Sequence, residues 1–138
     1  MEIRALERTD LSIRRESDII DVRRKARAIT QARGFDTFAA AALTTAASEL
    51  ARNVWVHGGG GVVTFEEVSD GVRVGVRLTF KDEGPGIADV ERVMAGGFST
   101  VRSLGLGLSG ARRLVDEFVI ETAPGRGTSV VITKWTRF

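Results

Sequence analysis

The feature that most constrains this chain is the position of its glycines. Of the 16 glycines, 15 lie between Gly58 and Gly127, and only Gly34 precedes them. With 2 prolines and 43% hydrophobic residues, the chain is not a disordered linker and can bury a core. Because glycine permits close backbone approach and left-handed conformations, we expect the clustered glycines to serve particular backbone positions inside a folded domain.

Composition excludes several classes of protein. The chain has no cysteine and 1 histidine, which excludes disulfides, thiolate zinc sites, cysteine nucleophiles and multi-histidine metal sites. No apolar run approaches the roughly 20 residues of a membrane span, and the N-terminus lacks the apolar core of a signal peptide. We therefore expect a soluble, cytoplasmic protein with no membrane contact, and the length of 138 residues predicts one domain, 1–138.

The net charge of +2 is unevenly distributed. Residues 1–33 carry nine basic and six acidic side chains, and a basic cluster falls on a predicted helix: Arg23, Arg24, Lys25 and Arg27. This cluster is either a solvated helix face or a surface for an acidic partner. Nucleic-acid binding is not favoured, because no aromatic residues alternate with these charges.

Hydrophobic periodicity and turn residues predict the order β-α-α-β-β-α-α-β-β. After a strand within 3–15, Asp18 is expected to cap a helix that ends at Gly34, and Asp36 or Thr37 to cap a second helix. The other expected elements are strands at 62–68 and 72–80, a short helix at 88–94, a flexible loop at 95–104, a helix at 106–117, and strands at 118–122 and 129–135. This order predicts a two-layer α/β sandwich, whose mixed, mostly antiparallel sheet has its helices on one face.

Two segments place polar residues in arrangements suited to binding. Glu49 and Asn53 are four residues apart on a predicted helix and so share one face. A carboxylate there can accept a hydroxyl proton, and an amide oxygen is a hard ligand suited to Mg²⁺. Asp82 follows a strand and begins a glycine-proline turn that ends at Ile87, so it can accept a hydrogen bond from an exocyclic amine. Taken alone, these segments also fit solvated helix residues and an ordinary tight turn.

Two further segments are rich in glycine. Gly105-Leu106-Gly107-Leu108-Ser109-Gly110 matches the dinucleotide-binding pattern by letter, but it follows a loop instead of a strand, which argues against a dinucleotide-binding fold. At the start of a predicted helix, its backbone N–H groups still suit a phosphate. Gly127 and Thr128 end a Gly-x-Gly turn, and the Thr128 hydroxyl can contribute to the base-binding end.

Together, the four segments resemble the ATP-binding boxes of the GHKL superfamily (gyrase, Hsp90, histidine kinase, MutL). The matching residues are Glu49, Asn53, Asp82, Gly84, Gly86, Gly105, Gly107, Gly127 and Thr128. Histidine kinases carry a dimerisation helix pair with a phosphoacceptor histidine, and gyrase, Hsp90 and MutL carry a transducing domain. We expect neither in 138 residues. The branch left is the stand-alone anti-sigma-factor-type serine/threonine kinases, and segments 97–100, 113–118 and Lys134-Trp135 resemble the stressosome switch kinases of the RsbT type.

The resemblance implies ATP and Mg²⁺ as cofactors and phosphoryl transfer to a Ser or Thr of a STAS-domain protein. It implies that Glu49 takes the proton of the attacking hydroxyl, that Asn53 holds Mg²⁺, and that residues 95–104 form a lid. The residues implied to bind ATP are Asn53, Asp82, Gly84, Gly86, Ile87, Arg102, Gly105, Leu106, Gly107, Leu108 and Thr128.

Partner exchange is also implied by the resemblance. A STAS-domain scaffold would hold the kinase, be phosphorylated and release it to activate a PP2C-type phosphatase. Two alternatives stay open: an anti-sigma factor kinase that sequesters a sigma factor, and a non-catalytic nucleotide-binding adaptor, against which the intact Glu49, Asn53 and Asp82 argue. If Glu49 oriented water, the same site would be an ATPase. The run 58–61 matches no box, and its role is left open.

Overall fold

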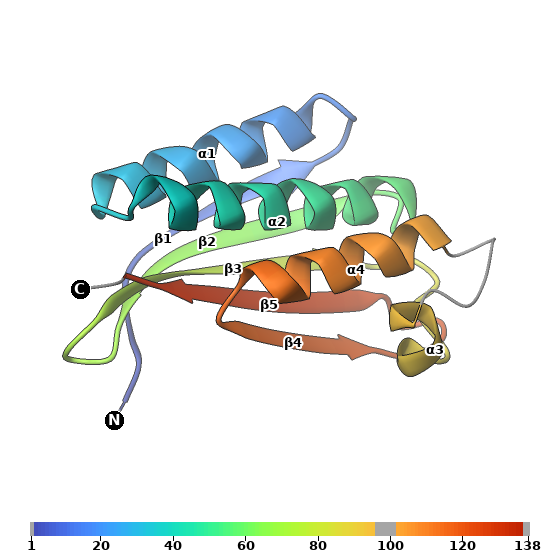
Figure 1. The fold of residues 1–138 in the computed structure, drawn as a ribbon. Helices are drawn as coiled ribbons and strands as arrows, with labels where there is room; N and C mark the ends of the chain where they lie inside the picture. Colours follow the sequence, from blue (N-terminus) through green and yellow to red (C-terminus); the bar gives the residue numbers. More distant parts are fainter. Residues whose placement is uncertain (1, 96–101, 137–138) are drawn as a thin grey trace.

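The computed structural model describes residues 2–95 and 102–136 and arranges them in two layers (Figure 1). One layer is a sheet of five strands: β1 (Arg4–Ile13), β2 (Gly61–Ser69), β3 (Val74–Asp82), β4 (Glu117–Thr122) and β5 (Thr128–Trp135). The other layer lies across one face of this sheet and consists of α1 (Asp18–Ala32), α2 (Thr37–Val56) and α4 (Arg102–Leu114). The short helix α3 (Val90–Met94) lies at one end of the molecule.

The sheet has the strand order β1-β2-β3-β5-β4, and every neighbouring pair is antiparallel. This confirms the two-layer α/β sandwich; the sheet, expected to be mixed and mostly antiparallel, is antiparallel at all of these pairings. The reason is visible in the connection between β1 and β2. It contains α1 and α2, which run in opposite directions, so the chain re-enters the sheet antiparallel to the strand that it left (Figure 1).

The starts of the first two helices follow from short side chains that accept backbone hydrogen bonds. Asp36 caps α2, since its carboxylate accepts the Ala39 N–H at 2.7 Å. Asp18 was expected to cap α1, but Ser17 occupies the cap position and Asp18 is the first helical residue. The Asp18 carboxylate instead accepts the N–H groups of Arg14 (2.8 Å) and Arg15 (3.0 Å), which lowers its pKa and fixes the turn that leaves β1.

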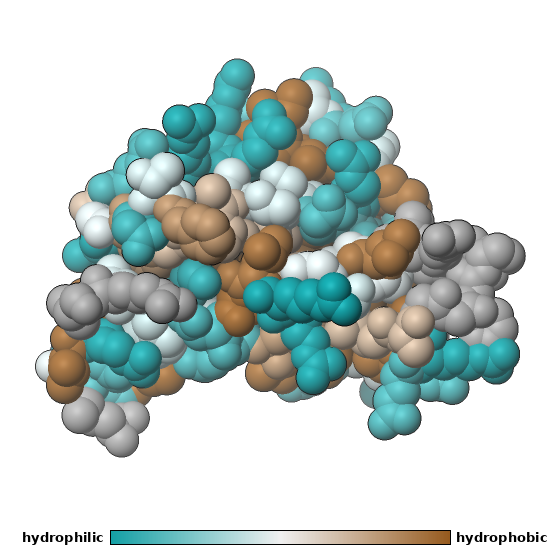
Figure 2. Space-filling model, in the orientation of Figure 1, coloured by the Kyte–Doolittle hydropathy of each residue, from teal (hydrophilic) through white to brown (hydrophobic). Residues whose placement is uncertain are grey.

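A single hydrophobic cluster fills the space between the helices and the sheet. From α2, Leu43 and Leu50 are fully buried, and they belong to the same cluster as Phe65 of β2 and Phe80 of β3. Burying side chains of this size stabilises the fold by about 1.5–3 kcal/mol each. Figure 2, which has the orientation of Figure 1, shows a surface on which hydrophilic and hydrophobic residues are mixed.

Helix α4 differs from the sequence-based expectation at both ends. It begins at Arg102, within the segment expected as a loop, and ends at Leu114, three residues before the predicted end. It ends early because the Asp116 N–H donates to the Thr133 carbonyl at 3.0 Å and Glu117 joins β4. The predicted lid overlaps residues 96–101, which lie outside the described residues.

The Lys134-Trp135 pair at the end of β5 joins the sheet to the chain that leaves α4. Lys134 is buried, and its Nζ donates to the Leu114 carbonyl at 3.0 Å, at the C-terminus of α4. The Trp135 ring is covered by the Arg73 guanidinium at 4.4 Å, and its Nε1 donates to Glu117 at 2.6 Å. These contacts fix the end of α4 relative to the strands. None of the helices in the described ranges combines the length and apolarity needed to cross a membrane.

Candidate functional site

A cavity of about 140 Å³ opens between α2, α4 and the strands β3 and β5. Most of its lining is apolar, with a few polar groups among the apolar side chains, as is usual for sites that bind a small molecule. The lining residues are Leu50, Asn53, Val54, His57, Phe80, Asp82, Pro85, Gly86, Ile87, Leu104, Leu108, Thr128 and Val130.

Asn53 supplies an unusual polar group to this cavity. Its side chain is buried, with 9% of its surface exposed, and its Nδ2 has no hydrogen-bond partner among the described residues. Buried amides normally have partners, so this unpaired N–H group is available to donate to an acceptor that enters the cavity. Gly107 of α4 packs against it, since a Cβ at Gly107 would lie 3.1 Å from both polar atoms of the amide.

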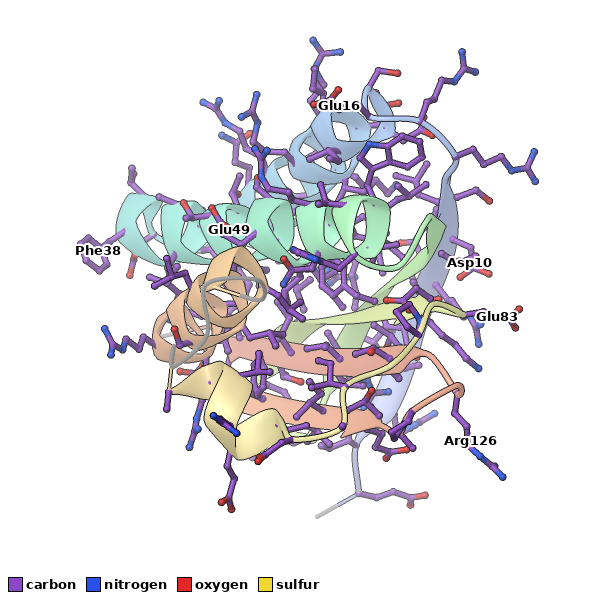
Figure 3. The ribbon with its side chains drawn as sticks, turned by 90° about the vertical axis from the view of Figure 1, so that its right-hand side faces the viewer. Asp10, Glu16, Phe38, Glu49, Glu83 and Arg126 are labelled. Atoms are coloured by element: carbon purple, nitrogen blue, oxygen red, sulfur yellow. The ribbon has the colours of Figure 1, made fainter. Side chains whose placement is uncertain are left out.

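Glu49 lies one helical turn before Asn53 on α2 and is half-buried. Figure 3 shows its side chain on the side of α2 that faces α4. It does not line the cavity itself. The carboxylate therefore lies beside the site that Asn53 marks, where it can receive a proton from a group bound there.

Asp82 is the last residue of β3, and its carboxylate is held by the backbone on two sides. It accepts the Gly84 N–H at 2.9 Å and also the N–H of Thr128, its partner in the β3–β5 register. Burial raises the pKa of Asp82, although these two hydrogen bonds and the nearby His57 oppose the rise. Burial also lowers the pKa of His57, opposed by the Asp82 charge. Asp82 is thus a fixed hydrogen-bond acceptor in the cavity wall.

The glycine run 58–61 forms the tight connection from α2 to β2, which answers the question left open by the sequence. A Cβ at Gly58 would overlap the Asp82 carboxyl group, and a Cβ at Gly61 would overlap the Lys81 carbonyl oxygen. Gly60 adopts φ 108° while its N–H donates to Val54 at 2.9 Å. Side chains at Gly58 and Gly61 are excluded because the connection after α2 packs directly against the end of β3, which carries Asp82.

The turn after β3 and the β4–β5 hairpin are interlocked. Gly86 has φ 73°, and a Cβ there would overlap the Ala123 carbonyl oxygen. The Gly125 N–H donates to Pro85 at 2.8 Å. Figure 3 shows Glu83 and Arg126 on these two neighbouring loops. The hydroxyl of Thr122, at the end of β4, accepts the Ile87 N–H of the turn after β3 and donates to the Gly127 carbonyl of the hairpin.

The structure gathers six of the predicted ATP-site residues around the cavity, namely Asn53, Asp82, Gly86, Ile87, Leu108 and Thr128. Gly84 is adjacent through its hydrogen bond to Asp82. Leu106 does not line the cavity and is 58% exposed. The Arg102 side chain lies outside the described part of the structure.

The glycines of α4 lie differently from the expected phosphate cradle. Because α4 begins at Arg102, Gly105 and Gly107 fall inside the helix, where N–H groups bond within the helix. A Cβ at Gly105 would overlap the Val93 carbonyl oxygen of α3, so this glycine permits close packing of the two helices. The backbone N–H groups without helical partners are those of the first turn, residues 102–104.

Most of the apolar lining and His57 were not predicted from the sequence. The missed residues are Leu50, Val54, His57, Phe80, Pro85, Leu104 and Val130. Their signal was periodicity: Leu50 and Val54 lie on the inward face of α2, and Phe80 and Val130 are register partners on the inward face of the sheet. Nothing in a single sequence distinguishes such core positions from cavity walls.

Comparison with known proteins identifies the family. Residues 39–137 match the model of the Histidine kinase-, DNA gyrase B-, and HSP90-like ATPase family. The chain belongs to this GHKL family. It is 43% identical over 122 residues to the serine/threonine-protein kinase RsbT of Bacillus subtilis, a match that covers 88% of this chain and 92% of RsbT. It is 33% identical over 99 residues to the anti-sigma F factor of a Thermoanaerobacter strain, covering 67% of this chain and 68% of that protein.

Solved structures share the GHKL fold. The RsbU and RsbW domains of a Mycobacterium tuberculosis protein align with TM-score 0.66 and 23% identity over 96% of this chain. This chain spans 33% of that larger structure. A chain of the SiaB–SiaC complex of Pseudomonas aeruginosa aligns with TM-score 0.55 and 13% identity, covering 92% of this chain and 89% of that chain.

These matches confirm the prediction of a GHKL serine/threonine kinase that uses ATP. The residues present also fit Mg²⁺. Mg²⁺ is usually held by one or two protein oxygens, with phosphates and water completing its shell. The described residues contain no cluster of three or more His, Cys, Asp or Glu that could hold a metal, so an ion bound through the side-chain oxygen of Asn53 would depend on phosphate oxygens in this way.

Proposed function

We propose that this chain transfers the γ-phosphoryl group of ATP to a serine or threonine of a STAS-domain protein and acts as a partner switch in bacterial signalling. The observation that carries the proposal is the unpaired, buried Asn53 amide in the same cavity as Asp82, with the Glu49 carboxylate one helical turn away. The 43% identity to a serine/threonine-protein kinase supports a protein hydroxyl as the acceptor.

In this proposal the cavity holds the adenine. The Asp82 carboxylate accepts a hydrogen bond from the exocyclic amine, and Thr128 contributes its hydroxyl beside it. Apolar side chains such as Phe80 and Ile87 exclude water from the base, while Gly84 and Gly86 let the turn approach it. Leu104 and Leu108 close the cavity from α4.

The phosphates lie toward Asn53 and the first turn of α4 in this proposal. Asn53 would hold Mg²⁺, which when bound neutralises phosphate charge. The N–H groups of residues 102–104 favour an anion at the helix N-terminus. Gly107 matters because it allows α4 to approach the Asn53 amide.

Transfer depends on positioning and on removal of one proton. The substrate hydroxyl oxygen forms a bond to the γ-phosphorus, the bond from that phosphorus to the β–γ bridging oxygen breaks, and ADP leaves. Glu49 accepts the hydroxyl proton as the new bond forms. A docked protein substrate that keeps water from Glu49 favours transfer over ATP hydrolysis.

The proposed partners are a STAS-domain scaffold or antagonist as substrate and a PP2C-type phosphatase as the effector activated on release, all in the cytoplasm. The second candidate is an anti-sigma factor kinase, because anti-sigma F factors are 32–34% identical to this chain over about two thirds of its length. Binding of a sigma factor to the purified chain would favour this second candidate.

The test is to incubate the chain with γ-labelled ATP, Mg²⁺ and the STAS-domain proteins encoded beside it. We expect label on a serine or threonine of one of them. Glu49→Gln removes the proton acceptor at constant shape, so label transfer should fall at least about 100-fold while ATP affinity is kept. Glu91→Gln, an exposed carboxylate on α3, is the control. Equal transfer by Glu49→Gln and wild type would refute the role of Glu49.

A further inference from the structure

We propose that Thr122, which does not line the cavity, is the positioning residue that makes the site select a purine with an amino group at position 6. The inference rests on the nucleotide site of the proposed function and concerns a residue outside the four segments that resemble the ATP-binding boxes. It follows from the hydrogen bonds of one hydroxyl group.

The Thr122 hydroxyl lies where three segments meet. It accepts the N–H of Ile87, in the turn after β3, at 2.9 Å. It donates to the carbonyl of Gly127, in the β4–β5 hairpin, at 2.8 Å. It also lies 3.0 Å from the hydroxyl oxygen of Thr128, the first residue of β5. Ile87 and Thr128 line the cavity, so Thr122 contacts two lining residues without lining the cavity itself.

The available protons decide the direction of these bonds. A threonine hydroxyl has one proton to donate and two lone pairs to accept with. The Gly127 carbonyl can only accept, so the Thr122 proton goes to it. The Thr128 hydroxyl must then donate to Thr122, whose second lone pair is filled by the Ile87 N–H. This arrangement satisfies every group in the cluster.

The consequence for the cavity is that Thr128 has no proton left for a ligand. Its oxygen presents lone pairs, and its register partner Asp82 presents a carboxylate. This polar part of the wall therefore consists of two acceptors side by side. A 6-amino purine offers a donor to them, whereas a 6-oxo purine offers another acceptor and leaves buried acceptors unpaired, which is costly.

The chain offers a matched set of variants for testing this. Thr122→Val keeps the shape and removes the hydroxyl, Thr122→Ser keeps the hydroxyl, and Thr136→Val is the control. The Thr136 hydroxyl also donates to a backbone carbonyl, that of Val74, at 2.8 Å, and Thr136 is likewise half-buried. Thr136 does not line the cavity.

The experiment measures the affinity of the full chain for ATP and for inosine triphosphate, which carries an oxo group in place of the 6-amino group. We expect the wild type to prefer ATP. In Thr122→Val the freed Thr128 hydroxyl can rotate and donate to the oxo group, so the preference should fall about five-fold. Thr122→Ser and Thr136→Val should keep the preference within about two-fold.

The ratio of the two affinities separates positioning from general stability. A purely structural loss in Thr122→Val would weaken both nucleotides equally and leave the ratio unchanged, which would overturn the inference. If Thr122→Val does not fold, Thr122→Cys applies the same test, because a thiol is only a weak donor and acceptor. The inference is also wrong if the wild type binds both nucleotides equally, even if the kinase is active. Conversely, a chain that shows these ratios but labels no STAS-domain protein retains the inference and loses the proposed function.

Discussion

At the scale of single residues, the site contains two groups whose pKa values are shifted in opposite directions from their ordinary values. Burial raises the pKa of Asp82 and lowers that of His57, so both shifts favour the neutral form of the side chain. The Gly84 and Thr128 N–H groups donate hydrogen bonds to the charged form of Asp82 and so oppose the rise of its pKa. Binding of an amine donor needs that charged form.

A pH dependence follows from the raised pKa of Asp82. Because its pKa is raised, Asp82 stays protonated in the folded chain at a pH where it has lost its proton in the unfolded chain. The contribution of Asp82 to the free energy of unfolding therefore increases as the pH falls through that interval. ATP binding should change in the opposite sense. As the pH falls through the raised pKa of Asp82, affinity for ATP should decline, starting above the ordinary aspartate range near about 4. Titration of nucleotide affinity against pH measures this decline.

Two variants identify the group responsible for that decline. Asp82→Asn should bind ATP weakly and without acid-side dependence, because its amide does not titrate in this range. His57→Gln should keep the decline, since His57 is not the acceptor. A decline that disappears in His57→Gln would assign the pH dependence to the histidine instead. In both variants, thermal unfolding separates loss of binding from loss of fold.

The polar residues of the site were easier to predict from the sequence than the residues that position them. Asn53 and Asp82 were identified because each stands at a fixed place in a short segment, and the structure puts both in one cavity. Thr122 was not identified, since it acts on Ile87, which lies 35 residues away along the chain. The role of Gly58 was not predicted for the same reason, because it depends on Asp82 at the end of β3. Such long-range side-chain contacts leave no periodic pattern.

At the scale of elements, α4 shows how one residue type can indicate the wrong boundary. Its glycines predicted a loop followed by a helix start near 106, but the helix already includes Gly105. Glycine is tolerated within this helix because close packing needs it: Gly105 abuts α3 and Gly107 abuts the Asn53 amide of α2. The strands and α2 were predicted more accurately, because their apolar periodicity and the Asp36 cap act locally.

Two glycines of α4 therefore give opposite predictions. Gly105→Ala should destabilise the chain by about 1–3 kcal/mol, as expected for overpacking, because the new Cβ would overlap the Val93 carbonyl oxygen. Gly110→Ala meets nothing within 4 Å and should stabilise the helix by up to about 1 kcal/mol. Urea unfolding of both variants measures the difference. Similar changes in the two variants would mean that Gly105 is not packed as described.

At the scale of the whole molecule, the basic cluster lies on α1, whereas the cavity lies between α2, α4 and the sheet. On α1 the side chains of Arg23, Arg24 and Arg27 are exposed, while Val22 and Ala26 are buried against the rest of the fold. A shallow surface groove runs from Ile19 and Arg23 of α1 to Ser48 and Arg52 of α2. Ser48 directly precedes Glu49 along α2, but consecutive residues of a helix do not face each other, and Glu49 lies on the side of α2 that faces α4. A substrate that docks on this groove would have to extend past α2 to bring its hydroxyl to Glu49.

This placement makes the choice between a solvated helix face and a docking surface testable. The double variant Arg23→Glu/Arg27→Glu should raise the KM for an acidic STAS-domain substrate about 10-fold, because charge complementarity sets encounter and orientation. Affinity for ATP should not change, since neither side chain lines the cavity. The control Arg4→Glu/Arg8→Glu makes the same change in net charge on exposed residues of β1. Added salt should weaken wild-type phosphorylation and leave the α1 variant less affected. If both double variants lower phosphorylation equally, net charge is the cause and the arginines of α1 are a solvated face.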